Sequence, residues 1–202
     1  MDPRPIGIFD SGLGGLSVAR ALIDLLPDER LLYFGDTARF PYGPKGRDEV
    51  VKYAIEITDL LVERGAKLVI VACNSASAVA LDELRARHDV PIMGVVGPGV
   101  RAAMKATSTG RVGVVGTVGT IASGAYPSAL AALDPGRSIE LTAAACPGFV
   151  EFVEAGEIDS DQVHVLAERL LAPVRAAGVD VLVLGCTHYP LMARTLAAVM
   201  GR

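Results

Sequence analysis

Short apolar runs recur along this chain and alternate with segments in which apolar residues have helical spacing. The runs predict strands at Pro5–Phe9, Leu31–Phe34, Leu68–Ala72, Val112–Val115, Ile139–Ala143 and Val179–Leu184. The intervening segments predict helices at Leu16–Leu26, Glu49–Glu63, Ser75–Arg87, Gln162–Ala177 and Leu191–Met200. Such alternation is typical of βαβ units, in which helices cover a parallel sheet. The pattern therefore predicts an α/β fold with open parallel sheets.

Two similar pairs of segments occur in the same order, which suggests an internal duplication. Ile6–Gly12 aligns with Val112–Val118, and Ala66–Ser75 aligns with Val179–His188. The alternative is that buried strands resemble one another by chance. A duplication predicts two related α/β domains with pseudo-two-fold symmetry and an active site between them. Glycine and proline interrupt the pattern at Gly94–Gly99, so we expect a first domain at residues 1–97 and a second at 98–202.

Composition excludes several classes of protein. The chain has 202 residues, 51% of them hydrophobic, which is enough for a substantial core. A net charge of -4 argues against a nucleic-acid partner. The chain begins without a signal-peptide pattern, and no apolar segment reaches the roughly 20 residues of a membrane span, so we expect a cytoplasmic protein without a membrane partner. Lysines are few, and none directly follows a predicted strand where a pyridoxal Schiff base is usually offered, so we expect no cofactor.

The three cysteines lie far apart, in a pattern that fits neither a disulfide scaffold nor a metal site. Cys73 and Cys186 each follow a buried run and precede polar residues, Asn74-Ser75 and Thr187-His188. A thiol at the end of a strand and near a helix N-terminus is expected to have a pKa below about 8.5. The alternative is that such a cysteine is a small buried hydrophobic residue, which is our interpretation of Cys146.

The turn Phe9–Gly15 contains a carboxylate, a hydroxyl and several glycines where the chain enters a helix. Its backbone N–H groups are suited to an anionic ligand group. The turn also partly matches a dinucleotide-binding fingerprint, with Asp36 as the distal acid. Ser17 replaces the third glycine of that fingerprint, and Asp10 would place negative charge beside the phosphates. A nucleotide-binding domain is therefore the weaker alternative.

Two further turns contain candidate ligand contacts. Tyr42 lies between two prolines, so it is either a rigid packing residue or a contact to the ligand. The hydroxyls of Thr117 and Thr120 either hold a carboxylate or cap the helix that follows.

Only one of the three histidines is a candidate for chemistry. His188 lies beside a candidate thiol and is placed to polarise it or a reacting group. His88 and His164 lie in charged or helical surroundings, and we interpret both as solvated surface residues.

Six motifs of the chain resemble those of the glutamate racemases of the aspartate/glutamate racemase superfamily. The motifs are IGIFDSGLGGLSV, YFGDTARFPYG, VACNSAS, GVVGTVGT, CPGFVEFVEAG and VLGCTHYPL, and they extend along nearly the whole chain. The resemblance implies an isomerase that interconverts L- and D-glutamate without a cofactor or a metal and supplies D-glutamate for bacterial peptidoglycan. It also implies a homodimer, because members of the family commonly form one.

The resemblance assigns roles to individual residues. As catalytic residues it implies Cys73, Cys186, Asp10, His188 and Glu154. As substrate contacts it implies Asp10, Ser11, Pro41, Tyr42, Gly43, Asn74, Ser75, Thr117, Thr120, Thr187 and His188. Ser75 stands where the family usually has threonine, and it keeps the hydroxyl.

Members of this family extend beyond the Tyr-Pro-Leu segment with elements that return to the first domain, whereas this sequence ends at Arg202. We therefore expect apolar surface to be exposed. An inactive or partner-binding fragment is one alternative to an active racemase, and a racemase of aspartate or another acidic amino acid is a second. Inversion of a stereocentre by proton transfer requires a base on each face of the carbon, and two opposed thiols meet that requirement.

Overall fold

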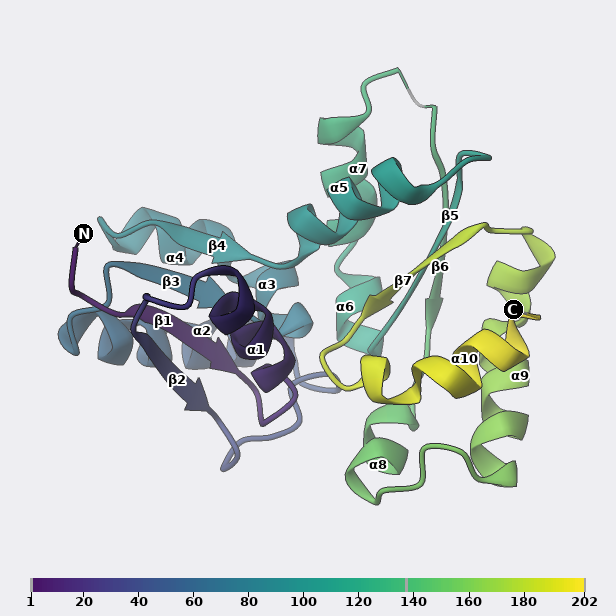
Figure 1. The fold of residues 1–202 in the computed structure, drawn as a ribbon, viewed down its shortest axis with the longest axis horizontal. Helices are drawn as coiled ribbons and strands as arrows, with labels where there is room; N and C mark the ends of the chain where they lie inside the picture. The colour runs from purple at the N-terminus through teal and green to yellow at the C-terminus, as the bar shows by residue number, and fades with distance from the viewer. Residues whose placement is uncertain (1, 137, 202) are drawn as a thin grey trace. The chain divides into compact units, whose positions relative to one another are not determined.

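A computed structural model describes residues 2–136 and 138–201 of the chain, which divides into two compact units, Met1–Val95 and Val96–Arg202 (Figure 1). The first unit contains β1 (Ile6–Asp10), α1 (Leu16–Leu25), β2 (Leu31–Gly35), α2 (Arg47–Glu63), β3 (Leu68–Val71), α3 (Asn74–Val79), α4 (Leu81–Arg87) and β4 (Ile92–Gly94). The second contains α5 (Val96–Ala106), β5 (Arg111–Gly116), α6 (Val118–Ala122), α7 (Ala125–Leu133), β6 (Glu140–Ala145), α8 (Phe149–Glu154), α9 (Asp161–Ala176), β7 (Val181–Gly185), the 3-10 turn η1 (Tyr189–Met192) and α10 (Ala193–Val199).

The first unit is built on a parallel sheet with strand order β2-β1-β3-β4. Ile6 and Ile8 of β1 pack with Ala19 of α1 on one face of this sheet. On the other face, Phe9 packs in a cluster that includes Ile57 of α2. Helices thus cover both faces, which explains why the strands are continuous apolar runs without polar alternation.

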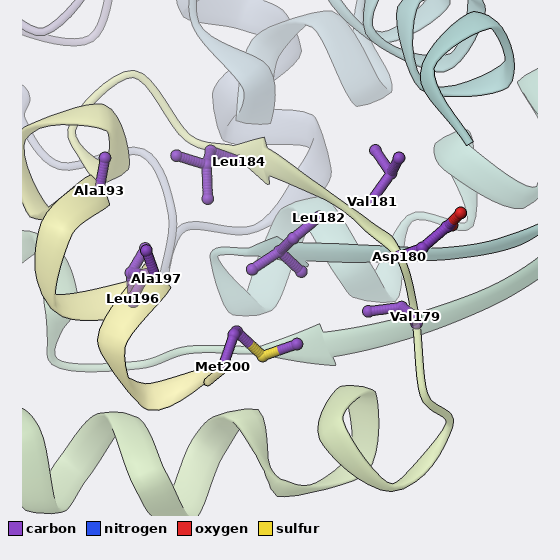
Figure 2. Close-up of a pocket in the computed structure, with 9 residues that line it drawn as sticks. All are labelled: Val179, Asp180, Val181, Leu182, Leu184, Ala193, Leu196, Ala197 and Met200. Atoms are coloured by element: carbon purple, nitrogen blue, oxygen red, sulfur yellow. The ribbon is translucent and has the colours of Figure 1, made fainter. Parts of the chain in front are cut away.

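The second unit contains a parallel sheet with strand order β6-β5-β7. Val114 of β5 packs against Val100 of α5 and Tyr126 of α7 on one face. On the opposite face, Gly113 leaves room for the side chains of Leu182 and Val179 (Figure 2) and of Val174 of α9, which would lie 2.9, 3.2 and 3.4 Å from a Cβ atom there. Together the two sheets confirm the predicted α/β fold with parallel strands.

The two units share a strand topology. In each, the first strand of the unit lies at the centre and pairs in parallel with the next two: β1 with β2 and β3, and β5 with β6 and β7. The aligned segments of the sequence fall on equivalent strands, β1 with β5 and β3 with β7. The shared topology supports the duplication. The units differ in one respect, because β4 extends only the first sheet.

An aspartate ties the start of β7 to the loop that precedes β5. The carboxylate of Asp180 accepts hydrogen bonds from the hydroxyl of Thr107 at 2.5 Å, from the backbone N–H of Ser108 at 2.7 Å and from that of Thr109 at 2.9 Å. These hydrogen bonds lower the pKa of Asp180 well below its usual value. The contact joins segments more than seventy residues apart in sequence.

The region expected to be a boundary is in part regular structure. Val95 and Val96 separate the units, two residues before the expected division after residue 97. The sequence pattern missed β4 and the whole of α5, which runs through Gly97, Pro98 and Gly99, and it also missed α6, α7 and α8. Proline is tolerated in the first turn of a helix, since the N–H groups there have no partner within the helix.

The interpretation of His88 as a solvated surface residue is wrong. Its side chain is only 7% exposed. One ring nitrogen lies 2.9 Å from the carbonyl oxygen of Leu84, and the other lies 2.7 Å from a carboxylate oxygen of Asp59. His88 thus links α4 to α2. His164, by contrast, is exposed and pairs with Asp159.

Within residues 2–136 and 138–201, no helix combines the length and apolar composition that a bilayer crossing requires.

Candidate active site

The turn after β1 is organised around the buried carboxylate of Asp10. Its Oδ2 accepts hydrogen bonds from the backbone N–H of Gly12 at 3.2 Å and of Gly15 at 3.1 Å. Gly15 is the last residue before α1, and a Cβ atom there would lie 2.6 Å from the Cβ of Asp10. Only glycine therefore fits at this position with Asp10 in place.

Cys73 lies at the same edge of the sheet as Asp10. Phe9 of β1 pairs with Val71 of β3, so the residues that follow these two strands are neighbours. The Cys73 thiol is 4% exposed and accepts hydrogen bonds from the backbone N–H groups of Ser11 and Ala76 and from the hydroxyl of Ser11. Donors from two different turns thus converge on one sulfur atom.

The expectation that a helix N-terminus lowers the pKa of Cys73 is wrong. Burial, and secondarily the charge of Asp10, raise the pKa of this thiol to about 11, and the hydrogen bonds from Ala76 and Ser11 offset only part of the increase. Cys73 is therefore a neutral thiol near pH 7.

Asn74 and Ser75 form the first turn of α3, and both are buried. They follow Cys73 directly, so their side chains belong to the same edge of the first sheet.

The loop after β2 packs Tyr42 into the core of the first unit. Its ring belongs to the cluster that contains Cys73, and its hydroxyl donates a hydrogen bond to the buried carboxylate of Asp36. Burial and this contact raise the pKa of Tyr42 far above its usual value. Of the two interpretations of Tyr42, packing residue or ligand contact, the buried side chain fits the packing residue. Pro41 is half-buried and Gly43 is buried. The backbone of this loop, rather than the Tyr42 side chain, is therefore the candidate for contact with a ligand.

In the second unit, Thr117 occupies the position after β5. Its hydroxyl accepts a hydrogen bond from the backbone N–H of Thr120 at 3.3 Å and lies 3.0 Å from the Thr120 hydroxyl. Thr117 is the N-cap of α6, and both threonines are buried. Thr117 thus caps α6, as one of the two interpretations expected, and the hydroxyls of Thr117 and Thr120 lie together in the same turn.

Cys186, His188 and Glu154 form a connected chain of groups. The Cys186 sulfur lies 4.0 Å from Nδ1 of His188, and Nε2 of the same ring lies 2.7 Å from Oε1 of Glu154. His188 is buried, whereas the Glu154 side chain is 53% exposed. Thr187 Oγ1 lies 3.4 Å from the same Nδ1. The carboxylate at the end of α8 thus fixes the orientation of the ring beside the thiol.

The third cysteine has a packing role. Cys146 is 1% exposed, and burial raises its pKa to about 12. Its carbonyl oxygen accepts a hydrogen bond from the hydroxyl of Tyr189 at 2.9 Å, and the Tyr189 ring packs edge-on against Phe149. These contacts anchor Tyr189, which follows β7 closely, and they match the interpretation of Cys146 as a buried hydrophobic residue.

Sequence reasoning missed two tyrosines that lie near the candidate groups. Tyr33 donates a hydrogen bond to the carbonyl oxygen of Gly12 at 2.9 Å, and burial, followed by the charges of Asp10 and Cys73, raises its pKa. Tyr126 is buried, and its pKa is raised by burial and by the charge of Cys186. Neither residue could be found from the chain alone, because each comes from an element distant in sequence.

The candidate residues thus form two groups, each within its own unit. The first comprises Asp10, Ser11, Cys73, Asn74 and Ser75, with the Pro41–Gly43 loop nearby; the second comprises Thr117, Thr120, Glu154, Cys186, Thr187 and His188. Among the residues that the structure describes, no three His, Cys, Asp or Glu side chains are arranged to hold a metal ion.

Comparison with known proteins places this chain among racemases. The family model described as Asp/Glu/Hydantoin racemase matches residues 13–202. The chain therefore belongs to the Asp/Glu/hydantoin racemase family, as the motifs led us to expect. Within that family, a glutamate racemase from Corynebacterium kroppenstedtii is 53% identical over 201 residues, which cover 100% of this chain and 69% of that protein.

Solved structures agree with this assignment. Glutamate racemase isoform RacE1 from Bacillus anthracis matches with a TM-score of 0.94 at 40% identity, over 100% of this chain and 75% of that one. Glutamate racemase from Francisella tularensis in complex with D-glutamate matches with a TM-score of 0.92 at 36% identity, again over 100% and 75% of the two chains. The relatives are thus longer than this chain.

Substitution of Gly15 tests the close packing around Asp10. We expect Gly15→Ala to lower the free energy of unfolding by about 1–3 kcal/mol, because the added methyl group displaces the Asp10 side chain. Gly46→Ala is the matched control, since nothing lies within 4 Å of a Cβ atom there. Urea denaturation measures both. Equal stability of the two variants would contradict the packing argument.

The raised pKa of Cys73 has a direct chemical readout. Only the thiolate form is alkylated, and for a thiol with a pKa of about 11 the thiolate fraction rises about tenfold per pH unit well below that pKa. The alkylation rate of Cys73 should therefore rise about tenfold per pH unit from pH 7 to 9.5. In the urea-unfolded chain the same cysteine should level off near pH 9. Mass spectrometry of the Cys73 peptide after iodoacetamide treatment follows both. A plateau below pH 9 in the folded protein would rule out the raised pKa.

Proposed function

We propose that this chain is a cofactor-independent glutamate racemase in which Cys73 and Cys186 exchange the α-proton of glutamate. The observation that carries the proposal is the equivalent placement of the two thiols. Each follows the third strand of its unit, β3 or β7, next to the turn that follows the central strand, β1 or β5. The identity to glutamate racemases along the whole chain supports the same conclusion.

Racemisation requires two acid/base groups. A single base returns the proton to the face that it left, whereas two groups on opposite faces of the α-carbon invert the centre. In the proposed reaction, one cysteine as thiolate removes the α-proton and the other as thiol delivers a proton to the opposite face; the roles exchange in the reverse direction. The proton count is unchanged, and no electron acceptor is needed.

The first unit holds its thiol protonated near pH 7, which suits Cys73 to the role of proton donor. The charge of Asp10 contributes to the raised pKa of this thiol. An amino-acid substrate carries an ammonium group, and an ammonium beside Asp10 would offset that charge and lower the pKa of Cys73. In this proposal the substrate itself prepares Cys73 for the step in which it must act as a base.

The second unit contains a base for its own thiol. With Nε2–H donated to Glu154, the Nδ1 atom of His188 is the acceptor that faces Cys186. Transfer of the Cys186 proton to Nδ1 gives a thiolate beside an imidazolium, and the Glu154 carboxylate stabilises that charge. The two thiols thus reach different protonation states by different means.

The carbanion that forms between the two proton transfers needs fixed donors. The candidates are the helix-start N–H groups together with the buried side chains of Asn74, Ser75, Thr117, Thr120 and Thr187. Donors that are positioned before the reaction stabilise developing charge without reorganisation.

Glutamate is the proposed substrate, and aspartate is the second candidate. The matched family model includes racemases of both amino acids by its description, whereas a relative that is 53% identical over the whole chain is named a glutamate racemase. Parallel assays with the two amino acids distinguish these substrates. We also propose a cytoplasmic enzyme that supplies D-glutamate for peptidoglycan, and a homodimer, which light scattering tests.

The two-thiol mechanism predicts the effect of single serine substitutions. Cys73→Ser and Cys186→Ser should each reduce racemisation of glutamate by at least about a thousandfold, because a hydroxyl is a much weaker acid than a thiol. Cys146→Ser is the matched control and should retain activity. Circular dichroism measures racemisation, and NMR in deuterated water follows exchange of the α-proton. Full racemisation in either of the first two variants would refute the proposal.

The chain from Glu154 to Cys186 predicts a second, smaller effect. Glu154→Gln keeps a hydrogen-bond acceptor for His188 but removes the charge that stabilises an imidazolium, so kcat should fall about tenfold or more with little change in KM. Glu157→Gln, an exposed acid three residues further on, is the control. Unchanged kcat in Glu154→Gln across the pH profile would show that His188 does not act through Glu154.

A further inference from the structure

A buried acid at the end of β2 belongs to neither group of candidate residues. Asp36 follows Gly35, the residue that pairs with Asp10 at the end of β1, and its backbone N–H donates a hydrogen bond to the carbonyl oxygen of Asp10 at 3.0 Å. Its side chain is only 4% exposed. A carboxylate that is buried requires partners that offset its loss of hydration. The side chains that bind Asp36 therefore indicate its role.

Both partners of the Asp36 carboxylate come from the loop that follows β2. Arg39 Nε donates a hydrogen bond to Oδ2 of Asp36 at 2.6 Å, and the hydroxyl of Tyr42 donates to the same oxygen. The backbone N–H of Arg39 also donates to the carbonyl oxygen of Asp36 at 3.2 Å. A carboxylate that is buried and bound in this way is not available to a ribose hydroxyl, which argues against the dinucleotide-binding interpretation of Asp36.

Helix α2 holds these two partners in place. The guanidinium of Arg39 lies 4.2 Å from the centroid of the Tyr53 ring, and its Nη1 lies 2.5 Å from a carboxylate oxygen of Glu56. The ring of Tyr42 is 1% exposed, and its centroid lies 5.7 Å from that of Tyr53. Tyr53 thus contacts both side chains that bind Asp36, so the loop is fixed to the helix as well as to the end of β2.

The same loop contacts both candidate turns of the first unit. The ring of Phe40 lies against the turn after β1, since a Cβ atom on Gly12 would be 2.9 Å from it. Tyr42 packs in the cluster that contains Cys73. A backbone N–H group is a donor that no substitution removes, so only the conformation of the loop decides where it points. The position of the Tyr42 side chain therefore controls what the adjoining backbone presents to a ligand.

We propose that Asp36 is a positioning residue for substrate binding, which holds Tyr42 and Arg39 inward and thereby fixes the backbone of Pro41–Gly43 in the conformation that receives glutamate. This inference rests on the proposed function, in which the backbone of this loop contacts the substrate. Asp36 does not touch the substrate itself. Groups that are held in place before binding lose less conformational entropy when the ligand arrives. Loss of the contact between Asp36 and Tyr42 should therefore weaken binding of the substrate more than it slows proton transfer.

Two substitutions remove the two halves of this contact. Asp36→Asn removes the charge of the acceptor, and Tyr42→Phe removes only the hydroxyl that donates. We expect each variant to raise KM for glutamate about tenfold and to change kcat by less than about threefold. Because both act through one contact, the double variant should raise KM no further than Asp36→Asn does. Circular dichroism at a series of glutamate concentrations measures both constants.

Asp59→Asn is the matched control. Asp59 belongs to the same unit, and its carboxylate also binds an arginine and a ring: it lies 2.8 Å from Arg87 and 2.7 Å from His88. Neither partner belongs to the loop after β2. We expect Asp59→Asn to lower the melting temperature, as Asp36→Asn does, but to leave KM unchanged. A purely structural role of Asp36 would give the two variants the same kinetics.

Amide hydrogen exchange tests the loop without the reaction. In the absence of glutamate, the backbone amides of Tyr42 and Gly43 should exchange about tenfold faster in Asp36→Asn and in Tyr42→Phe than in the unsubstituted protein. Their exchange should be unchanged in Asp59→Asn. NMR of the labelled protein resolves the two amides.

The outcomes are distinct. A higher KM and faster loop exchange in Asp36→Asn and Tyr42→Phe, both absent in the control, support the proposal. An unchanged KM in Asp36→Asn overturns it, as does an equal rise in Asp59→Asn or a double variant whose effects add. Failure of the proposed function is distinguishable, because the unsubstituted protein would then racemise no glutamate. In that case unchanged loop exchange in Asp36→Asn would still overturn the role of this residue.

Discussion

The parallel register of the central strands is the constraint on which the candidate chemistry depends. Phe9 pairs with Val71 in one sheet, and Gly116 pairs with Gly185 in the other. Because paired parallel strands end at the same edge, residues more than sixty positions apart become neighbours. A register shift by one residue would turn every side chain of a strand to the opposite face and would separate the thiols from their partners.

The two buried thiols occupy equivalent positions in their units but have different neighbouring groups. Around Cys73 the dominant influences are desolvation and a nearby carboxylate, which favour the neutral thiol. Beside Cys186, at 4.0 Å from its sulfur, lies the imidazole of His188, which a second carboxylate orients. Two units of the same strand topology therefore carry unlike side chains around their thiols. Such a difference suits a reaction in which one group must release a proton while the other accepts one.

Periodicity alone predicted most of the strands and long helices, since buried strands of a doubly covered sheet are continuous apolar runs. It failed at β4, which has only three residues and ends in a glycine, and at α5, where Gly97, Pro98 and Gly99 resemble a linker. It also failed at His88, whose burial depends on Asp59 from a different helix. The positions of Asp10 and both thiols followed from strand ends. The pKa of Cys73 did not, because the depth of burial and the approach of Asp10 are tertiary properties.

Asp180 has a consequence for the order in which the second unit folds. Its carboxylate closes a loop of more than seventy residues, and β5 finds both of its partners far along the chain, at residues 140–145 and 181–185. Contacts of such sequence separation require the largest loss of chain entropy before they form, so proteins rich in them fold slowly. We therefore expect the helices of this unit to form early. The β5 ladder should be complete only later, when β7 has paired with β5 and Asp180 has bound the Thr107–Thr109 loop.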